Sequence, residues 1–151
     1  MNVLIVVDFS AVTGAILDAI PRLIRAQEGG TVHLYLMHVA EPDPEFVGWD
    51  VGPEVVRDQM AAEFHREHLQ LEELATSLSA KANAEVTPLL VQGPIVETVG
   101  DEAAKLNASL VVVGSHGHGA TYDLLVGSIS SGIIKHSAIP VLVVPDPNRG
   151  A

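Results

Sequence analysis

Short apolar runs rich in Val, Ile and Leu alternate with longer helical patterns along the chain, and this alternation constrains the fold most. Such runs are typical of strands buried on both faces of a parallel sheet, which need crossover helices between them. We predict strands at 3–7, 31–39, 85–91, 109–113 and 141–144. Helices are predicted from Ser10 to about Gln27, from Pro53 to about Ala82, after Gly93-Pro94, and over Gly127–Ser137.

This order of elements predicts an open, doubly wound, five-stranded parallel sheet with four helices, a Rossmann-like α/β fold. One domain is expected over residues 1–151, with a frayed tail over about 146–151. Ser10 is the expected N-cap of the first helix, and Pro21 is expected to kink that helix or move its boundary. Ligands of such sheets bind beyond the C-terminal ends of the strands, where the strand order reverses, but the sequence leaves that order open.

The charge balance of the chain excludes a polyanionic partner. The formal net charge is −11, from 8 Lys and Arg against 19 Asp and Glu, whereas proteins that bind nucleic acid neutralise phosphates with basic side chains. An acidic protein can still bind one small anion through backbone N–H groups. There is no cysteine for a disulfide, a thiol nucleophile or a thiolate metal site.

The sequence also bears on where the protein works. Residues 1–7 lack a basic segment, and their apolar stretch is shorter than the hydrophobic segment of a signal peptide. No apolar run approaches the roughly 20 residues that a membrane-spanning helix needs. We therefore expect a cytoplasmic protein with no membrane partner.

The segment after the fourth predicted strand is the candidate ligand-binding segment of the chain. It reads Gly114-Ser-His-Gly117-His-Gly119, and Gly127-Ser128 then precede the last predicted helix. Glycine permits positive φ and close backbone approach, so N–H groups of the loop can turn toward phosphate oxygens. The first N–H groups of the helix and its dipole also favour an anion. Glycines in a strand-to-helix turn serve turn geometry as well, and the loop alone leaves both interpretations open.

A family resemblance favours the phosphate interpretation. The spacing Gly114-x2-Gly117-x9-Gly127-Ser128 resembles the nucleotide-binding signature of the universal stress protein family, in its ATP-binding branch. The likeness extends over VLIVVDFS, HLYLMHV, SLVVVGSHG and LLVGSISSGIIKHSAIPVLVVP, and so covers essentially the whole chain. It implies the version of the fold that is called adenine nucleotide alpha hydrolase-like. The P-loop pattern and a G-x-G-x-x-G after the first strand are both missing.

The resemblance implies a site for ATP or another adenine nucleotide (ADP, AMP or cyclic AMP). Mg²⁺ or Mn²⁺ is the divalent cation that usually accompanies a bound triphosphate. Asp8 would meet the ribose or the adenine, although it also fits a turn-former that caps the first helix. Val39 would line the adenine pocket. The residues implied around the ribose and phosphates are Val113, Gly114, His116, Gly117, Gly127, Ser128, Ile129 and Ser130. The resemblance also implies a homodimer in which Val141, Leu142, Val143 and Val144 pair with their copies.

The histidines do not form a predicted metal or catalytic site. His116 and His118 alternate in the loop and are expected to point to different sides, while His65 and His68 fit a solvated helix face. His33 and His38 belong to the second predicted strand and are interpreted as structural. No Ser-His-Asp, paired-carboxylate or Cys-His arrangement can be assembled by spacing.

The sequence thus predicts a stress-response protein that binds an adenine nucleotide, whose nucleotide state controls dimerisation or the binding of a protein partner. Two other hypotheses stay open. One is a weak ATPase or phosphotransferase that uses the same pocket, and the other is a partner-binding module that needs no nucleotide.

Overall fold

In the computed structural model, which describes residues 1–27, 29–40, 54–116 and 126–148, strands and helices alternate along the chain. The strands are β1 (Asn2–Val6), β2 (His33–Ala40), β3 (Glu85–Gln92), β4 (Leu110–Gly114) and β5 (Val141–Val144). The helices are α1 (Ala11–Arg25), α2 (Glu54–Ala82), α3 (Ile95–Lys105) and α4 (Ser128–His136). The predicted five strands and four helices are thereby confirmed, with ends shifted by one or two residues at several boundaries.

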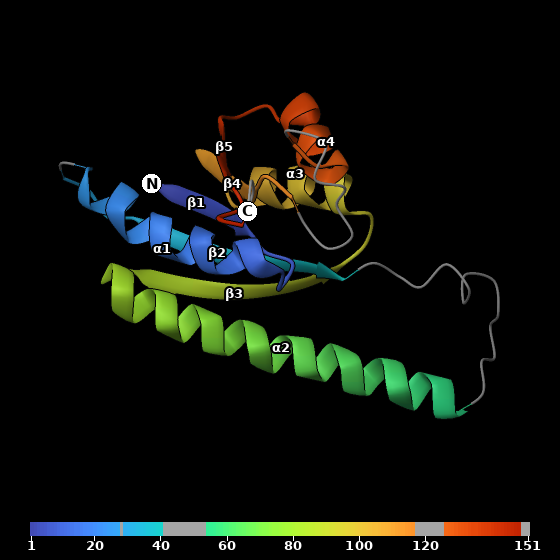
Figure 1. The fold of residues 1–151 in the computed structure, drawn as a ribbon. Coiled ribbons are helices and arrows are strands. Elements are labelled where there is room, and N and C mark those ends of the chain that lie inside the picture. The colour runs from blue at the N-terminus through green and yellow to red at the C-terminus, as the bar shows by residue number, and fades with distance from the viewer. Residues whose placement is uncertain (28, 41–53, 117–125, 149–151) are drawn as a thin grey trace.

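All strand pairs are parallel, and the sheet order is β3-β2-β1-β4-β5. Helices α1 and α2 cover one face of the sheet, and α3 and α4 cover the other (Figure 1). The chain first builds outward from β1 through β2 to β3, and then continues on the other side of β1 with β4 and β5. The doubly wound Rossmann-like fold is confirmed, and the strand order that the sequence left open reverses between β1 and β4.

The core consists of two apolar layers because successive strand residues point to opposite faces. In β1, Val3 and Ile5 pack with α1 and α2, whereas Leu4 packs with α3 and α4. In β4, Val112 belongs to the first layer and Val111 to the second. The sheet is therefore apolar on both faces, as the continuous runs of β-branched residues indicate.

Ser10 is the N-cap of α1, as predicted, although its side chain does not take part in the capping. Ser10 lies at the N-cap position in extended backbone, but its side chain makes no capping hydrogen bond, and its buried Oγ has no hydrogen-bond partner among the described residues. The turn is held instead by the Asp8 carboxylate, whose Oδ1 accepts from the Ser10 N–H at 3.0 Å. Pro21 is buried inside α1 and does not end it, because the helix continues to Arg25.

The two edges of the sheet are formed by β3 and β5. Strand β3 contains Pro88, which has no N–H to donate. Strand β5 has four residues and lies between Pro140 and Pro145. These prolines limit the backbone that each edge offers for pairing.

Helix α2 is much longer than the strands that it covers. Its 29 residues correspond to about 44 Å, against about 26 Å for the eight residues of β2 or β3. Leu71 and Leu78 are fully buried against the sheet, while Met60 and Phe64 are exposed. Figure 1 shows the first part of α2 extending past the ends of the strands.

Candidate functional site

The point where the strand order reverses brings two turns together at the C-terminal edge of the sheet. Strands β1 and β4 are hydrogen-bonded neighbours, with Ile5 in register with Val112. The turn that contains Asp8 follows β1, and the turn that contains Ser115 follows β4. In open α/β sheets this position is where ligands bind.

The turn after β1 is tightly specified by hydrogen bonds. The Val7 N–H donates to the Met37 carbonyl at 2.9 Å, which extends the contact with β2 by one residue. Asp8 then accepts from the Ser10 N–H, and the Ser10 carbonyl accepts from the Thr13 N–H at 3.0 Å. The sequence left open whether Asp8 forms a turn or contacts a ligand. The structure contains the turn, and the ligand contact stays a prediction.

Gly114 ends β4 where α1 approaches the sheet closely. A Cβ at this position would lie 2.5 Å from Cγ1 of Val12, in the first turn of α1. The described glycines with positive φ are Gly29, Gly30 and Gly93, so positive φ, which the sequence analysis allowed at Gly114, is not its reason. Gly114 is needed because α1 packs against the end of β4.

Ser115 joins three segments and is almost completely buried, at 2% exposure. Its N–H donates to the Val144 carbonyl of β5 at 2.8 Å, and its carbonyl accepts from the Gly127 N–H at 2.6 Å. Its Oγ accepts from the Asp146 N–H at 3.0 Å and lies 3.1 Å from Nδ1 of His116. The sequence analysis missed Ser115, since a small polar residue between Gly114 and His116 carries no signal of its own. The bond to Asp146 ties the first residue of the predicted tail to this turn, and the frayed tail over about 146–151 stays a prediction.

The first turn of α4 faces the same place. Gly127 is its N-cap, and a Cβ there would lie 3.3 Å from the Ser115 carbonyl oxygen, tighter than most contacts of that kind. Ser128 and Ile129 are exposed at the helix start. The first N–H groups of a helix have no partner inside the helix and carry the positive end of its dipole. This end of α4 is therefore suited to a negatively charged group.

Four other predicted residues are buried around these turns. The Ser130 hydroxyl donates to the Gly114 carbonyl at 2.6 Å, and this hydrogen bond holds the start of α4 against the end of β4. Val39 and Val113 are at most 6% exposed and belong to the apolar layer under α3 and α4. His116 is 5% exposed. Contact of these residues with a nucleotide stays a prediction, and Gly117 lies outside the described residues.

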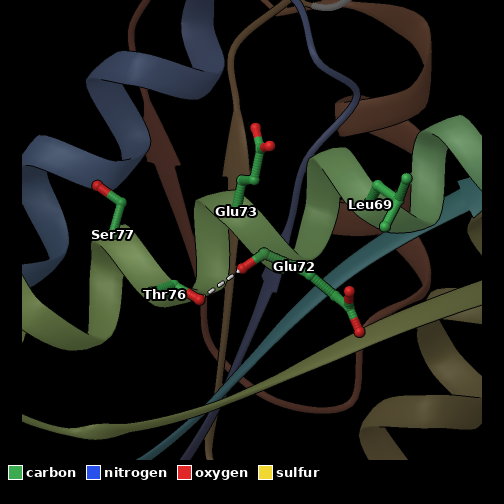
Figure 2. A pocket seen from close by; sticks show the side chains of 5 residues that line it. All are labelled: Leu69, Glu72, Glu73, Thr76 and Ser77. Carbon is green, nitrogen blue, oxygen red and sulfur yellow. Dashed lines mark hydrogen bonds between the residues drawn. The ribbon is translucent and has the colours of Figure 1, made fainter.

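The described residues offer little for other chemistry. No group of three or more His, Asp or Glu among them could hold a metal ion. An open depression on α2 is lined by Leu69, Glu72, Glu73, Thr76 and Ser77 (Figure 2). Its charged groups are two carboxylates, so it is unsuited to a phosphate. No helix in the described part of the chain is long and apolar enough to cross a membrane.

The fold and the site together define a doubly wound α/β protein whose glycine-rich turn after β4 contacts the N-terminus of a helix. A family model described as the universal stress protein family matches residues 1–145. The chain therefore belongs to the universal stress protein family, as its sequence predicts.

Curated relatives and solved structures agree with this assignment. Universal stress protein YxiE of Bacillus subtilis is 26% identical over 147 residues, covering 95% of this chain and 97% of the relative. Universal stress protein Rv1996 of Mycobacterium tuberculosis is 31% identical over 98 residues, which are 64% of this chain and 30% of that protein. The structure of UspA from Lactobacillus plantarum matches with a TM-score of 0.76 and 21% identity, covering 95% of this chain and 97% of the other.

Two further structures of similar fold contain nucleotides. One is a universal stress protein in complex with cAMP, with a TM-score of 0.60 and 17% identity over 97% of both chains. The other is the universal stress protein from Archaeoglobus fulgidus in complex with dAMP, with a TM-score of 0.62 and 18% identity, covering 95% of this chain and 97% of the other. At these identities the likeness to this chain is one of fold.

Proposed function

We propose that this protein binds an adenine nucleotide at the junction of β1, β4 and α4, and that nucleotide occupancy controls self-association or the binding of a protein partner. The observation that carries the proposal is the bond from the Gly127 N–H to the Ser115 carbonyl, 2.6 Å long. It holds the helix start against the glycine-rich turn at the reversal of strand order, where such folds bind ligands. Asp8 is at the same edge of the sheet and would contact the ribose or the adenine.

Backbone groups provide the charge complementarity that this acidic chain needs. A phosphate at the start of α4 would accept from N–H groups of Ser128 and Ile129 and would be stabilised by the helix dipole. Ser128 adds an exposed hydroxyl. Bound Mg²⁺ or Mn²⁺ would neutralise part of the charge of a triphosphate. The complexes of similar fold with cAMP and dAMP support an adenine nucleotide as the class of ligand.

Self-association would use the edge strand β5. The Pro140 carbonyl accepts from the Val111 N–H, and the Val144 carbonyl accepts from the Ser115 N–H. The backbone N–H and C=O groups of the even-numbered residues in β5 therefore point toward β4. The groups of Val141 and Val143 therefore face away from β4, because alternate residues of a strand point to opposite sides. Such an edge can pair with a second copy.

The proposal is tested with a charge placed at the helix start. Ser128→Asp puts a carboxylate in the first turn of α4, where it favours the helix by about 0.3–1 kcal/mol but repels phosphates. By titration calorimetry we expect ATP affinity to fall at least about tenfold, with adenosine unaffected. Ser131→Asp, exposed on the same helix but beyond its first turn, is the matched control and should retain ATP affinity.

Two outcomes would contradict the proposal. Wild-type protein freed of co-purified nucleotide that binds none of ATP, ADP, AMP and cyclic AMP, with or without Mg²⁺, would favour a partner-binding module. Equal loss of affinity in both variants would move the phosphates away from the start of α4. Recovery of the bound ATP intact after long incubation with Mg²⁺ would separate a regulatory ligand from a substrate.

A further inference from the structure

The ring of His38 contacts the chain on both sides of Asp8. His38 is in β2, and its Nδ1 lies 2.8 Å from the carbonyl oxygen of Val7. The same ring packs against the ring of Phe9, with centroids 4.4 Å apart and planes tilted by 39°. Asp8 is thus held between two residues that contact one imidazole.

The hydrogen bond fixes the tautomer of His38. A carbonyl oxygen only accepts hydrogen bonds, so Nδ1 carries the proton and donates it to Val7. The other ring nitrogen, Nε2, lies 3.7 Å from Oε1 of Glu67 on α2. The side chains of His38 and Glu67 are 12% and 26% exposed, so the cluster is largely shielded from water.

Phe9, whose ring contacts His38, has a strained backbone conformation. Phe9 has φ of 60°, a left-handed conformation that is an outlier for a bulky side chain. Conformations of this kind are strained and persist where the surroundings impose them. The surroundings here are the His38 ring on one side and the bond between Asp8 and the Ser10 N–H on the other.

We propose that His38 is a positioning residue for the nucleotide: it fixes Val7 by a hydrogen bond and Phe9 by ring contact, and so sets the direction of the Asp8 carboxylate. The inference rests on the proposed function, because it assigns Asp8 to the ligand. It extends that function to a side chain that the sequence indicates only as structural. His38 itself touches no ligand in this scheme.

The test compares two substitutions of His38 that differ in one group. His38→Asn keeps an N–H donor near the position of Nδ1, whereas His38→Leu keeps the bulk and removes the donor. We expect the affinity for ATP and adenosine, measured by titration calorimetry, to fall about tenfold in the Leu variant, the effect of losing one hydrogen bond to a buried group. The Asn variant retains the donor but loses the ring contact with Phe9, so its affinity should lie between those of the wild type and the Leu variant.

Glu67→Gln is the matched control for the other side of the ring. It removes the charge that faces Nε2 and leaves the bond to Val7 in place, so nucleotide affinity should match wild type. Thermal melts of each variant show whether it is folded at the assay temperature. A purely structural role would lower the melting temperature of the Leu variant and leave its nucleotide affinity unchanged, which would overturn the proposal.

A measurement on the wild-type protein covers the case in which the Leu variant does not fold. Long-range ¹H–¹⁵N correlation spectra at mildly alkaline pH should show His38 with a protonated Nδ1, and the ring signals should shift when nucleotide binds. A ring protonated at Nε2 alone would overturn the inference, and so would ring signals that nucleotide leaves in place. Wild-type protein that binds no adenine nucleotide would instead overturn the proposed function, so the two failures are distinguishable.

Discussion

At the scale of single residues, Ser115 connects the end of β4 to β5, to the start of α4 and to the C-terminal segment. Its hydroxyl oxygen accepts from the Asp146 N–H in a partly buried hydrogen bond and lies 3.1 Å from Nδ1 of His116 in a buried contact. Removing this hydroxyl leaves a backbone N–H without its acceptor. The cost of such a loss is about 1–3 kcal/mol.

Ser115→Ala is therefore expected to lower the free energy of unfolding by about 1–3 kcal/mol, measured by urea denaturation. Ser109→Ala is the comparison, because the Ser109 hydroxyl donates to the Asn2 carbonyl at 3.1 Å on the surface, where water can replace it. Its effect should be no more than about 0.5 kcal/mol. Equal effects of the two substitutions would show that the Ser115 hydroxyl does not hold these segments together.

The sequence identified the glycine-rich turn but not the reasons for its residues. Gly114 fits the expected spacing, yet the structure gives its cause as the approach of Val12 from α1, a contact between residues about a hundred positions apart. The resemblance implies that Ser130 lies around the ribose and phosphates, and the structure adds that its hydroxyl donates to the Gly114 carbonyl. The spacing of residues in the sequence identifies the motif. The hydrogen-bond partner of each hydroxyl depends on how elements that are distant in the sequence pack against each other.

At the scale of elements, two helical glycines differ in what surrounds them. Gly14 is exposed in α1, and a Cβ there would meet nothing within 4 Å. Gly132 is in α4, where a Cβ would lie 2.9 Å from Cγ2 of Val96 on α3. Val96 is β-branched and cannot move its methyl groups by a small rotation. The close approach of α3 and α4 thus depends on a glycine at 132.

Gly14→Ala is expected to raise the free energy of unfolding by about 0.5–1 kcal/mol, because alanine favours a helix interior over glycine. Gly132→Ala carries the same local gain and should nevertheless destabilise the protein, because α3 and α4 must separate or Val96 must adopt a poorer rotamer. Urea denaturation of both variants measures the contrast. A stabilising Gly132→Ala would mean that the two helices repack without cost.

The kind of each element could be predicted from the sequence, because buried parallel strands and crossover helices have distinct apolar periods. The spacing of apolar residues does not show how much of a helix packs against the sheet. In α2 the apolar residues recur along the helix, yet Leu71 is buried and Phe64 is 42% exposed. The difference follows from the length of the strands below, which no pattern within the helix encodes.

At the scale of the whole molecule, the strand order creates the candidate site. The five apolar runs are too similar to reveal which strands are neighbours, so the sequence alone could not place the turn after β1 beside the turn after β4. That neighbourhood comes from β4 pairing with β1. The family resemblance supplied the expected site residues, and the topology gives the physical reason that residues near 8, 115 and 127 meet.

The edge position of β5 leads to a prediction about assembly. Val143→Pro removes an N–H that faces away from β4 and should convert a dimer into a monomer, measured by sedimentation equilibrium. Circular dichroism would check that the variant stays folded. Ile134→Lys, on the exposed surface of α4, is the control and should leave the mass unchanged. Wild-type protein that sediments as a monomer, or a Val143→Pro variant that remains folded and dimeric, would exclude β5 as the interface.

The prolines at the sheet edges also limit how far assembly can go. A sheet extends into a fibre only when each added copy leaves an open edge for the next. Once two copies have joined through β5, the edges left outside are both β3, where Pro88 interrupts the row of donors. The other edge offers four residues between Pro140 and Pro145, enough for one partner strand. Growth would then stop at a closed pair, and concentrated protein should stay free of fibrils during long storage.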